Sequence, residues 1–308
     1  MAKVVKVCFY STKPYDQEYF EKTLASQSTI VGENVKVEFT FLPVSLSAST
    51  VSQAAGHDAV CIFVNDTCNA EVLKALHSLN IRLVLLRCAG FNNVDLIAAS
   101  DLGIAVLRVP RYSPHAVAEH AISLLCTLTR RIHRGSNRVK EHNFSLTGLI
   151  GFDIYKRTAG VVGTGAIGKI AAGILRNGFG CRVLAYDPRP DHAWAQQAKV
   201  EYVSKEQLFK EAMIITLHVP MSPETQYIIN KESLAMMQDG VTIINTARGG
   251  LVDTKALIPA LRSGKVAAYG ADVYEGEAPY FFEDRSNAPI ADAMLADLVA
   301  FPNVILTG

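Results

Sequence analysis

Three glycines in the segment GVVGTGAIG constrain this 308-residue chain more than any other feature. Gly163, Gly165 and Gly168 follow an apolar β-type run and open an apolar helical run. In a βα unit of this kind the first glycine permits the tight turn, the second lets the backbone approach a pyrophosphate, and the third lets the helix press onto the sheet. The helix N-terminus adds free N–H groups and a partial positive charge. The segment therefore predicts a Rossmann dinucleotide-binding unit.

The second strand of this unit ends in an acidic residue. Asp187 closes the run CRVLAYD, where a carboxylate can accept hydrogen bonds from the adenosine ribose and repel a 2′-phosphate. This favours NAD over NADP, although Arg189, two residues on, would suit the phosphate. Flavin nucleotides bind to the same fingerprint, so these residues alone leave NAD and a flavin open.

Short β-branched runs recur along the chain and alternate with helical patterns such as 70–79. Continuous apolar strands between amphipathic helices indicate parallel sheets covered on both faces. We therefore expect an α/β chain with two doubly wound parallel-sheet domains, a flavodoxin-like domain followed by the Rossmann domain. The expected strands are 4–10, 35–42, 59–64, 82–88 and 105–109 in the first, and 158–162, 182–186, 213–218, 242–245, 266–270 and 304–307 in the second.

Between the two series lies the pattern of one long helix, from Pro114 to about Val139, with Ser113 as its N-cap and Pro114 in its first position. The two prolines of VPRYSP break the pattern just before it. We therefore expect a boundary at Tyr112, which gives domains 1–112 and 113–308.

Composition limits the partners that the chain can have. Its 30 basic and 29 acidic residues nearly cancel and form no long run of one sign, so nothing indicates a nucleic-acid surface. The sequence has no apolar run of about 18 residues and no signal-like start, so we expect no membrane span and a cytoplasmic location. The six cysteines are scattered without a C-x-x-C pair, which indicates buried thiols and no metal site.

Motifs along essentially the whole chain resemble the D-isomer-specific 2-hydroxyacid dehydrogenase family, and within it the fermentative D-lactate dehydrogenases. They include LRCAGFNNVDL, VPRYSPHAVAEHA, NFSLTGLIGFDIY, LHVPMSPET, INTARGGLVD and DVYEGEAPYFFEDRSN. The resemblance implies that 1–112 is the substrate domain, completed by a C-terminal return segment, and that 113–308 binds NAD. It also implies reduction of a small 2-oxo acid such as pyruvate by hydride transfer from NADH, and it removes the flavin alternative.

The resemblance assigns the catalytic chemistry to Arg248 and Glu277. Arg248 matches the family's arginine, whose guanidinium can hold the substrate carboxylate and the ketone oxygen. Glu277 matches a glutamate that favours the imidazolium form of a histidine, so that the histidine can protonate the alkoxide. Ala89 and Gly90 match the loop whose N–H groups receive the substrate carboxylate, and Tyr112 matches an aromatic residue that faces the substrate.

The other matched positions surround the cofactor in the family, and Asp272 matches the aspartate that holds the nicotinamide carboxamide. The implied NAD contacts are Gly163, Gly165, Ala166, Ile167, Gly168, Asp187, Val219, Pro220, Thr225, Thr246, Ala247 and Asp272. The pair Glu119–His120 lies within the expected long helix, where we expect packing or dimer contacts. A homodimer or larger homo-oligomer is expected, because family members pair through that helix.

The chain stops at FPNVILTG, where the family continues at once with its catalytic histidine. None of the eight histidines follows the last expected strand, so we expect a sequence cut short before the proton donor and the return segment. The expected function is that of an NAD-dependent D-lactate dehydrogenase. The alternatives are a hydroxypyruvate or glyoxylate reductase of the same family and, if the protein ends at Gly308, a non-catalytic NAD-binding interaction protein.

Overall fold

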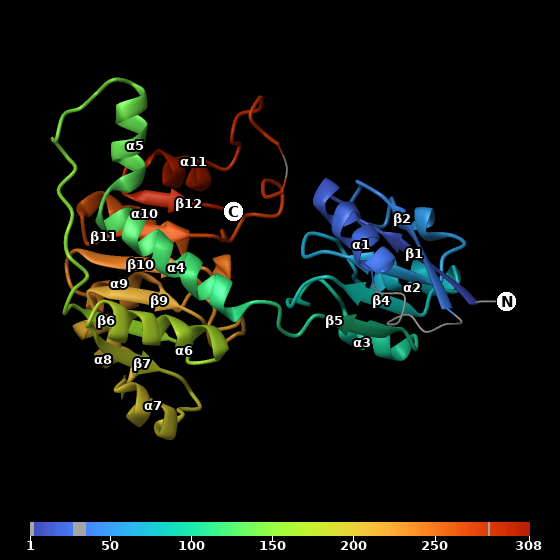
Figure 1. Ribbon diagram of the computed structural model, residues 1–308, viewed down its shortest axis with the longest axis horizontal. Helices are drawn as coiled ribbons and strands as arrows, with labels where there is room; N and C mark the ends of the chain where they lie inside the picture. The colour runs from blue at the N-terminus through green and yellow to red at the C-terminus, as the bar shows by residue number, and fades with distance from the viewer. Residues whose placement is uncertain (1–2, 27–34, 283) are drawn as a thin grey trace. The chain divides into compact units, whose positions relative to one another are not determined.

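The computed structural model describes residues 3–26, 35–282 and 284–308, and the chain divides into two compact units, 1–112 and 113–308 (Figure 1). Each unit is a parallel sheet with helices interleaved along the chain. Neighbouring residues of one strand pack into different apolar clusters: Ile214 and Ile215 of the same strand point to opposite faces. The α/β class predicted from the sequence is confirmed.

The first unit contains a five-stranded sheet in the order β2-β1-β3-β4-β5, with every neighbouring pair parallel. This is the flavodoxin-like order. Its strands are β1 Lys3–Phe9, β2 Val35–Phe41, β3 Ala59–Ile62, β4 Leu83–Leu86 and β5 Ala105–Arg108. Its helices are α1 Pro14–Ser26, η1 Val51–Ala54, α2 Ala70–Ser78 and α3 Leu96–Asp101.

The second unit contains a seven-stranded parallel sheet in the order β12-β11-β10-β9-β6-β7-β8. The chain runs outward from β6 to β8 and then returns to the other side of β6, which is the Rossmann arrangement with its switch point between β6 and β9. The strands are β6 Thr158–Val162, β7 Arg182–Tyr186, β8 Glu201–Tyr202, β9 Ile214–Leu217, β10 Val241–Asn245, β11 Val266–Ala271 and β12 Val304–Leu306. The helices are α4 Pro114–Thr129, α5 Ile132–Lys140, α6 Ala166–Gly173, η2 Ile174–Gly178, α7 His192–Ala198, α8 Lys205–Glu211, α9 Lys231–Met236, η3 Gly249–Leu251, α10 Thr254–Ser263 and α11 Ala293–Ala300.

The prediction of one long helix from Pro114 to Val139 is wrong. The helix α4 ends at Thr129, and α5 begins at Ile132 as a separate helix (Figure 1). Between them, Arg131 adopts a left-handed conformation with φ of 54°, which interrupts the helix. The break frees the carbonyl of Thr129, which accepts a hydrogen bond from the N–H of Phe152 at 3.3 Å. The two helices differ in burial: α4 buries its apolar face, whereas α5 has no buried residue.

Arg87 is a buried cation at the end of β4 in the first unit. Its guanidinium lies between the rings of Phe9 and Phe63, 4.6 and 4.7 Å from their centres, and donates to two carbonyl oxygens that follow β1, at 2.7 and 3.0 Å. It also pairs with the buried carboxylate of Asp16 at 3.4 Å. Arg87 therefore ties the end of β4 to the end of β1, and fixes the point from which the loop Ala89–Gly90 begins.

We predict that Arg87→Met destabilises the protein by about 3 kcal/mol, because it leaves the Asp16 carboxylate buried without its partner. The free energy of unfolding in urea measures this. The matched control is Lys36→Met, which removes the exposed pair between Lys36 and Glu38 and should change stability by less than about 0.5 kcal/mol. Equal losses in the two variants would contradict a structural role for the buried pair.

Candidate functional site

The strands of the second unit all run parallel, so the residues that follow them meet at one edge of the sheet. Ligands of open α/β sheets bind outside this carboxyl edge. Gly163 follows β6, Asp187 follows β7 and His218 follows β9, while Arg248 lies just beyond β10 and Asp272 follows β11. The fold therefore brings the sequence-predicted residues of this unit to one edge.

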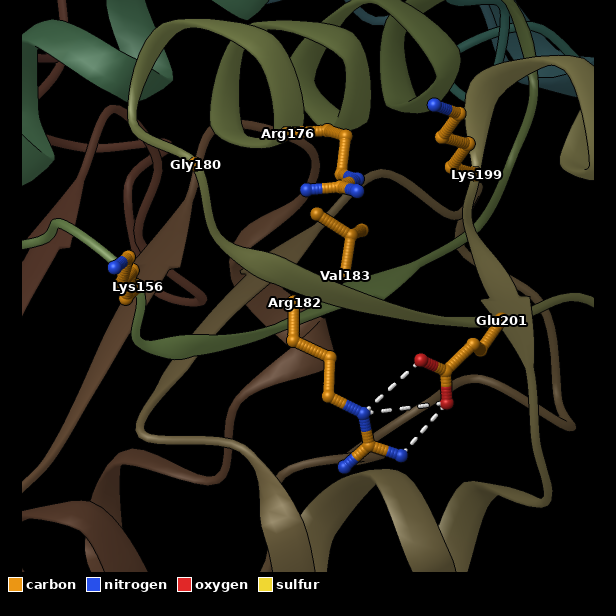
Figure 2. Close-up of a pocket in the computed structure, with 7 residues that line it drawn as sticks. All are labelled: Lys156, Arg176, Gly180, Arg182, Val183, Lys199 and Glu201. Atoms are coloured by element: carbon orange, nitrogen blue, oxygen red, sulfur yellow. Dashed lines mark hydrogen bonds and ion pairs between the residues drawn. The ribbon is translucent and has the colours of Figure 1, made fainter.

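An open hollow at the opposite edge is a separate feature (Figure 2). It lies at the amino end of β7, where the guanidinium of Arg182 pairs with Glu201 at 2.7 Å and with Glu211 at 2.6 Å. These two carboxylates raise the pKa of Arg182. No predicted site residue lines the hollow, whose walls are Lys156, Arg176, Gly180, Arg182, Val183, Lys199 and Glu201.

The glycine-rich turn has the close contacts that its sequence predicts. Gly163 has a φ of 92°, and a Cβ there would lie 2.7 Å from the carbonyl oxygen of His218. A Cβ on Gly168 would lie 1.9 Å from the carbonyl oxygen of Gly163. Gly165, by contrast, faces open space, with no heavy atom within 4 Å of a Cβ built there. Because α6 begins at Ala166 without a side-chain cap, its N–H groups are available to an anion, which fits a pyrophosphate.

Besides its predicted contact with the ribose, Asp187 accepts hydrogen bonds from neighbouring residues of the protein. One carboxylate oxygen accepts hydrogen bonds from the N–H and the hydroxyl of Thr164, at 2.8 and 3.2 Å. The other oxygen accepts from the N–H of Arg189 at 2.9 Å. The Thr164 hydroxyl also contacts the Tyr202 hydroxyl at 2.6 Å. Asp187 thus braces the glycine-rich turn against the end of β7, a role that the sequence spacing does not reveal.

The loop that carries Arg248 is braced by Asn245, the fully buried last residue of β10. The Asn245 amide donates to the carbonyl of Arg248 at 2.8 Å and its oxygen accepts from the N–H of Ala247 at 3.1 Å. Gly249 lies under the backbone at Tyr274, where a Cβ would approach within 2.1 Å. The Arg248 loop and the loop after β11 are therefore in direct contact.

The two glutamates after β11 have different environments. Glu275 is engaged on both oxygens, by the N–H of Thr254 at 3.0 Å and the hydroxyl of Tyr227 at 2.8 Å. Glu277 accepts the N–H of Tyr274 at 2.8 Å. Burial raises the pKa of the Glu277 carboxyl, the Arg248 cation opposes this, and the Asp272 carboxylate adds to it. Arg248 and Asp272 are thus close enough to Glu277 to influence its carboxyl, and Glu277, unlike Glu275, does not have both oxygens engaged by described residues.

Sequence reasoning assigned no site role to His120 or Thr307, yet both contact Asp272. The Thr307 hydroxyl donates to the Asp272 carboxylate at 2.7 Å. The Nε2 atom of His120 lies 2.9 Å from the Thr307 hydroxyl and 3.4 Å from Asp272. No local signal in the sequence could have found this cluster, because its members come from α4 and from the ends of β11 and β12.

The remaining cofactor-side residues follow β9 and β10. Val219 is buried against the glycine-rich turn, and the Thr225 hydroxyl donates to the carbonyl of Pro220 at 2.7 Å, which fixes the loop after β9. The hydroxyl of Thr246 is buried and has no partner among the described residues. Ala166, Ile167 and Ala247 lie in the first turn of α6 and in the Arg248 loop. These placements agree with a cofactor along the edge, and the individual contacts remain predictions.

In the first unit, Ala89 and Gly90 follow β4 at the carboxyl edge of its sheet. The Ala89 carbonyl accepts from Arg108 at 2.8 Å, and the Gly90 carbonyl accepts from the thiol of Cys88 at 3.3 Å. Neither N–H of Ala89 and Gly90 donates to another described residue, so both are available to an anion. Tyr112 is exposed at the end of this unit.

His218 is the histidine that follows β9. Its Nε2 atom lies 2.9 Å from the hydroxyl of Thr216, and burial lowers the pKa of its imidazole to about 4. The ring is therefore neutral near pH 7. It contributes no cation to the cofactor edge.

Across residues 3–26, 35–282 and 284–308, no group of three or more histidine, cysteine, aspartate or glutamate side chains is arranged to hold a metal ion. Within the same ranges, no helix combines the length and the apolar character needed to cross a membrane.

The Rossmann-type sheet, the glycine-rich turn and the open space at Gly165 are typical of a nucleotide-binding protein. Residues 122–308 match the family model for the D-isomer specific 2-hydroxyacid dehydrogenase, NAD binding domain. The chain belongs to this family. NAD, predicted from the sequence, is therefore confirmed as its cofactor.

Curated relatives and solved structures agree with this assignment. The chain is 47% identical over 304 residues to a 2-hydroxyacid dehydrogenase homolog of Zymomonas mobilis and, over the same length, 47% identical to the D-lactate dehydrogenase of Escherichia coli. Both alignments cover 99% of this chain and 89% of the relative. A solved structure of the pyruvate reductase of Chlamydomonas reinhardtii matches this chain with a TM-score of 0.89 and 39% identity, and the match covers 99% of this chain and 89% of that one. The D-lactate dehydrogenase of Aquifex aeolicus, complexed with NAD and lactic acid, matches with a TM-score of 0.83 and 32% identity, covering 98% and 87%.

We predict that the low pKa of His218 makes the protein less stable in mild acid. The unfolded chain takes up a proton near the ordinary histidine pKa of about 6.5, whereas the folded protein does so only near pH 4. Stability is therefore lost progressively as the pH falls from about 6.5 to about 4, by on the order of 2 kcal/mol. His218→Gln should flatten this slope in urea unfolding measured at pH 7 and pH 4.5. His115→Gln, at an exposed position, is the control, and identical slopes in the wild type and His218→Gln would refute the prediction.

Proposed function

We propose that the protein is an NAD-dependent D-lactate dehydrogenase that reversibly reduces pyruvate to D-lactate. The observation that carries the proposal is the carboxyl edge of the second unit, where Arg248 and Asp272 lie near Glu277, at the same edge of the sheet as the glycine-rich turn. The match to the D-lactate dehydrogenase of Escherichia coli, at 47% identity over 99% of this chain, supports the choice of substrate.

Each residue has a physical task in this proposal. NADH, when bound, supplies the hydride for C2 of the 2-oxo acid. The Arg248 guanidinium binds the carboxylate and polarises the ketone oxygen through charge-assisted hydrogen bonds. The N–H groups of Ala89 and Gly90 receive the substrate carboxylate, and Tyr112 helps to exclude water. One proton must reach the alkoxide oxygen, and Glu277 favours the imidazolium of the family's histidine donor.

Arg248 is poised for this task by its backbone. The Asn245 side chain holds both sides of the Arg248 loop, and the Arg248 guanidinium donates only to the carbonyl of Ala247, at 2.6 Å, among the described residues. No carboxylate forms a salt bridge with it in the described part of the chain. Its charge is therefore available to an anionic substrate.

The wider setting follows from the same proposal. Unit 1–112 serves as the substrate domain and unit 113–308 as the NAD domain. We expect a homodimer or a larger homo-oligomer that acts in the cytoplasm on a small 2-oxo acid, with neither nucleic acid nor membrane as a partner. The described cysteines are free thiols, most of them buried, which agrees with a reducing compartment.

A substrate panel tests the lactate assignment. In the protein as its source organism makes it, with NADH as reductant, pyruvate should give the highest kcat/KM among pyruvate, hydroxypyruvate, glyoxylate and 2-oxoisocaproate. Initial rates of NADH oxidation measure this. A preference for hydroxypyruvate or glyoxylate would replace the lactate assignment with a reductase of the same family, and no turnover of any of the four would favour the non-catalytic interaction protein.

Arg248→Gln should lower kcat/KM for pyruvate about 10²- to 10³-fold, because it removes charge-assisted donors from the developing alkoxide. The dissociation constant of NADH, measured by fluorescence, should stay within about twofold of the wild type. Arg262→Gln, which removes an exposed pair with Asp297, is the matched control and should keep full activity. Unchanged kinetics in Arg248→Gln would remove Arg248 from the site.

A further inference from the structure

We propose that His120 is a positioning residue for the nicotinamide ring: with Thr307 it orients the Asp272 carboxylate to accept a hydrogen bond from the carboxamide of NAD. The inference rests on the proposed function in one respect only, because it takes from the same family resemblance the role of Asp272 at the nicotinamide carboxamide. It gives a task to a histidine and a threonine that the proposed mechanism does not otherwise use.

The three side chains come from elements that the sheet already holds in place. His120 lies in the second turn of α4. Asp272 is fixed by its N–H, which donates to the carbonyl of Asn245 at 3.1 Å, and Thr307 by its N–H, which donates to the carbonyl of Ala271 at 3.0 Å. These backbone hydrogen bonds thus fix where Asp272 and Thr307 lie, and only the orientations of the side chains remain to be set.

The hydrogen-bond directions follow from counting protons. The Thr307 hydroxyl has one proton, which it donates to Oδ1 of Asp272 at 2.7 Å. It must therefore accept from His120, whose Nε2 lies 2.9 Å away. His120 consequently carries a proton on Nε2. That N–H also lies 3.4 Å from the same Oδ1 atom.

Both contacts fall on one carboxylate oxygen, and the other is left for the cofactor. No described residue donates a hydrogen bond to Oδ2 of Asp272. The nicotinamide carboxamide presents an NH₂ group, which needs an acceptor of this kind. Without His120 the Thr307 hydroxyl loses its donor partner and the carboxylate loses one restraint on its rotation, so we expect weaker binding of the nicotinamide half of NADH.

The test compares two ligands in the same variants. ADP-ribose contains the adenosine and pyrophosphate of NADH but no nicotinamide, so it does not reach Asp272. His120→Leu should weaken NADH binding about three- to tenfold and leave ADP-ribose binding unchanged. The effect is modest because the His120 and Asp272 side chains are 40% and 42% exposed, where a hydrogen bond contributes little. Titration calorimetry measures both dissociation constants.

Two further variants separate positioning from a general structural effect. His120→Gln restores an N–H donor near the Nε2 position and should recover most of the NADH affinity. His133→Leu is the matched control: its histidine lies in α5 and bonds the carbonyl of Pro302 at 3.2 Å, but not Asp272, so NADH affinity should not change.

Three results would overturn the proposal: unchanged NADH affinity in His120→Leu, an equal loss for NADH and ADP-ribose, or a His120→Gln variant as weak as His120→Leu. The test is independent of the 2-oxo acid, because it measures binding of cofactor fragments without substrate. A failed pyruvate assignment would therefore leave it intact.

Discussion

The parallel direction of all seven strands in the second unit is the constraint on which its chemistry depends. Strands that are distant in sequence end at the same edge, so a glycine turn, an arginine and two carboxylates meet there without any element being built for the purpose. The apolar packing on both faces holds the strand ends in register. Each loop then needs only one or two hydrogen bonds to be held in place, such as those between the Asn245 side chain and the backbone of Ala247 and Arg248.

The two glutamate carboxylates at this edge differ in the hydrogen bonds that they accept within the protein more than in their position along the chain. Glu275 and Glu277 lie two residues apart in the same loop, yet the first has both oxygens engaged by neighbours within the protein. Burial raises the pKa of the Glu277 carboxyl, and the Arg248 cation lowers it. Arg248 forms no salt bridge with a carboxylate of the described residues. The difference arises from the direction of each side chain and not from residue type.

Local patterns predicted the strands, their alternation with helices and the glycine turn, because each depends on residues close together in sequence. They failed at the break between α4 and α5, where Arg131 adopts a left-handed conformation that no sequence pattern announces, and at β8, which has only two residues and is too short to leave a pattern. They also missed Thr164, Asn245, His120 and Thr307. Each of these is polar, and its role is visible only when strand ends that are far apart in sequence are brought together.

The double task of Asp187 links cofactor choice to the shape of the turn. The carboxylate that would exclude a 2′-phosphate is the same group that fastens Thr164 and the backbone at Arg189. A change of preference from NAD to NADP would therefore need a positive charge for the 2′-phosphate and, in addition, new hydrogen bonds to hold the glycine-rich turn. Coenzyme preference thus depends on the same hydrogen bonds that hold this loop. A single substitution at position 187 would change both the recognition of the coenzyme and the conformation of the glycine-rich turn.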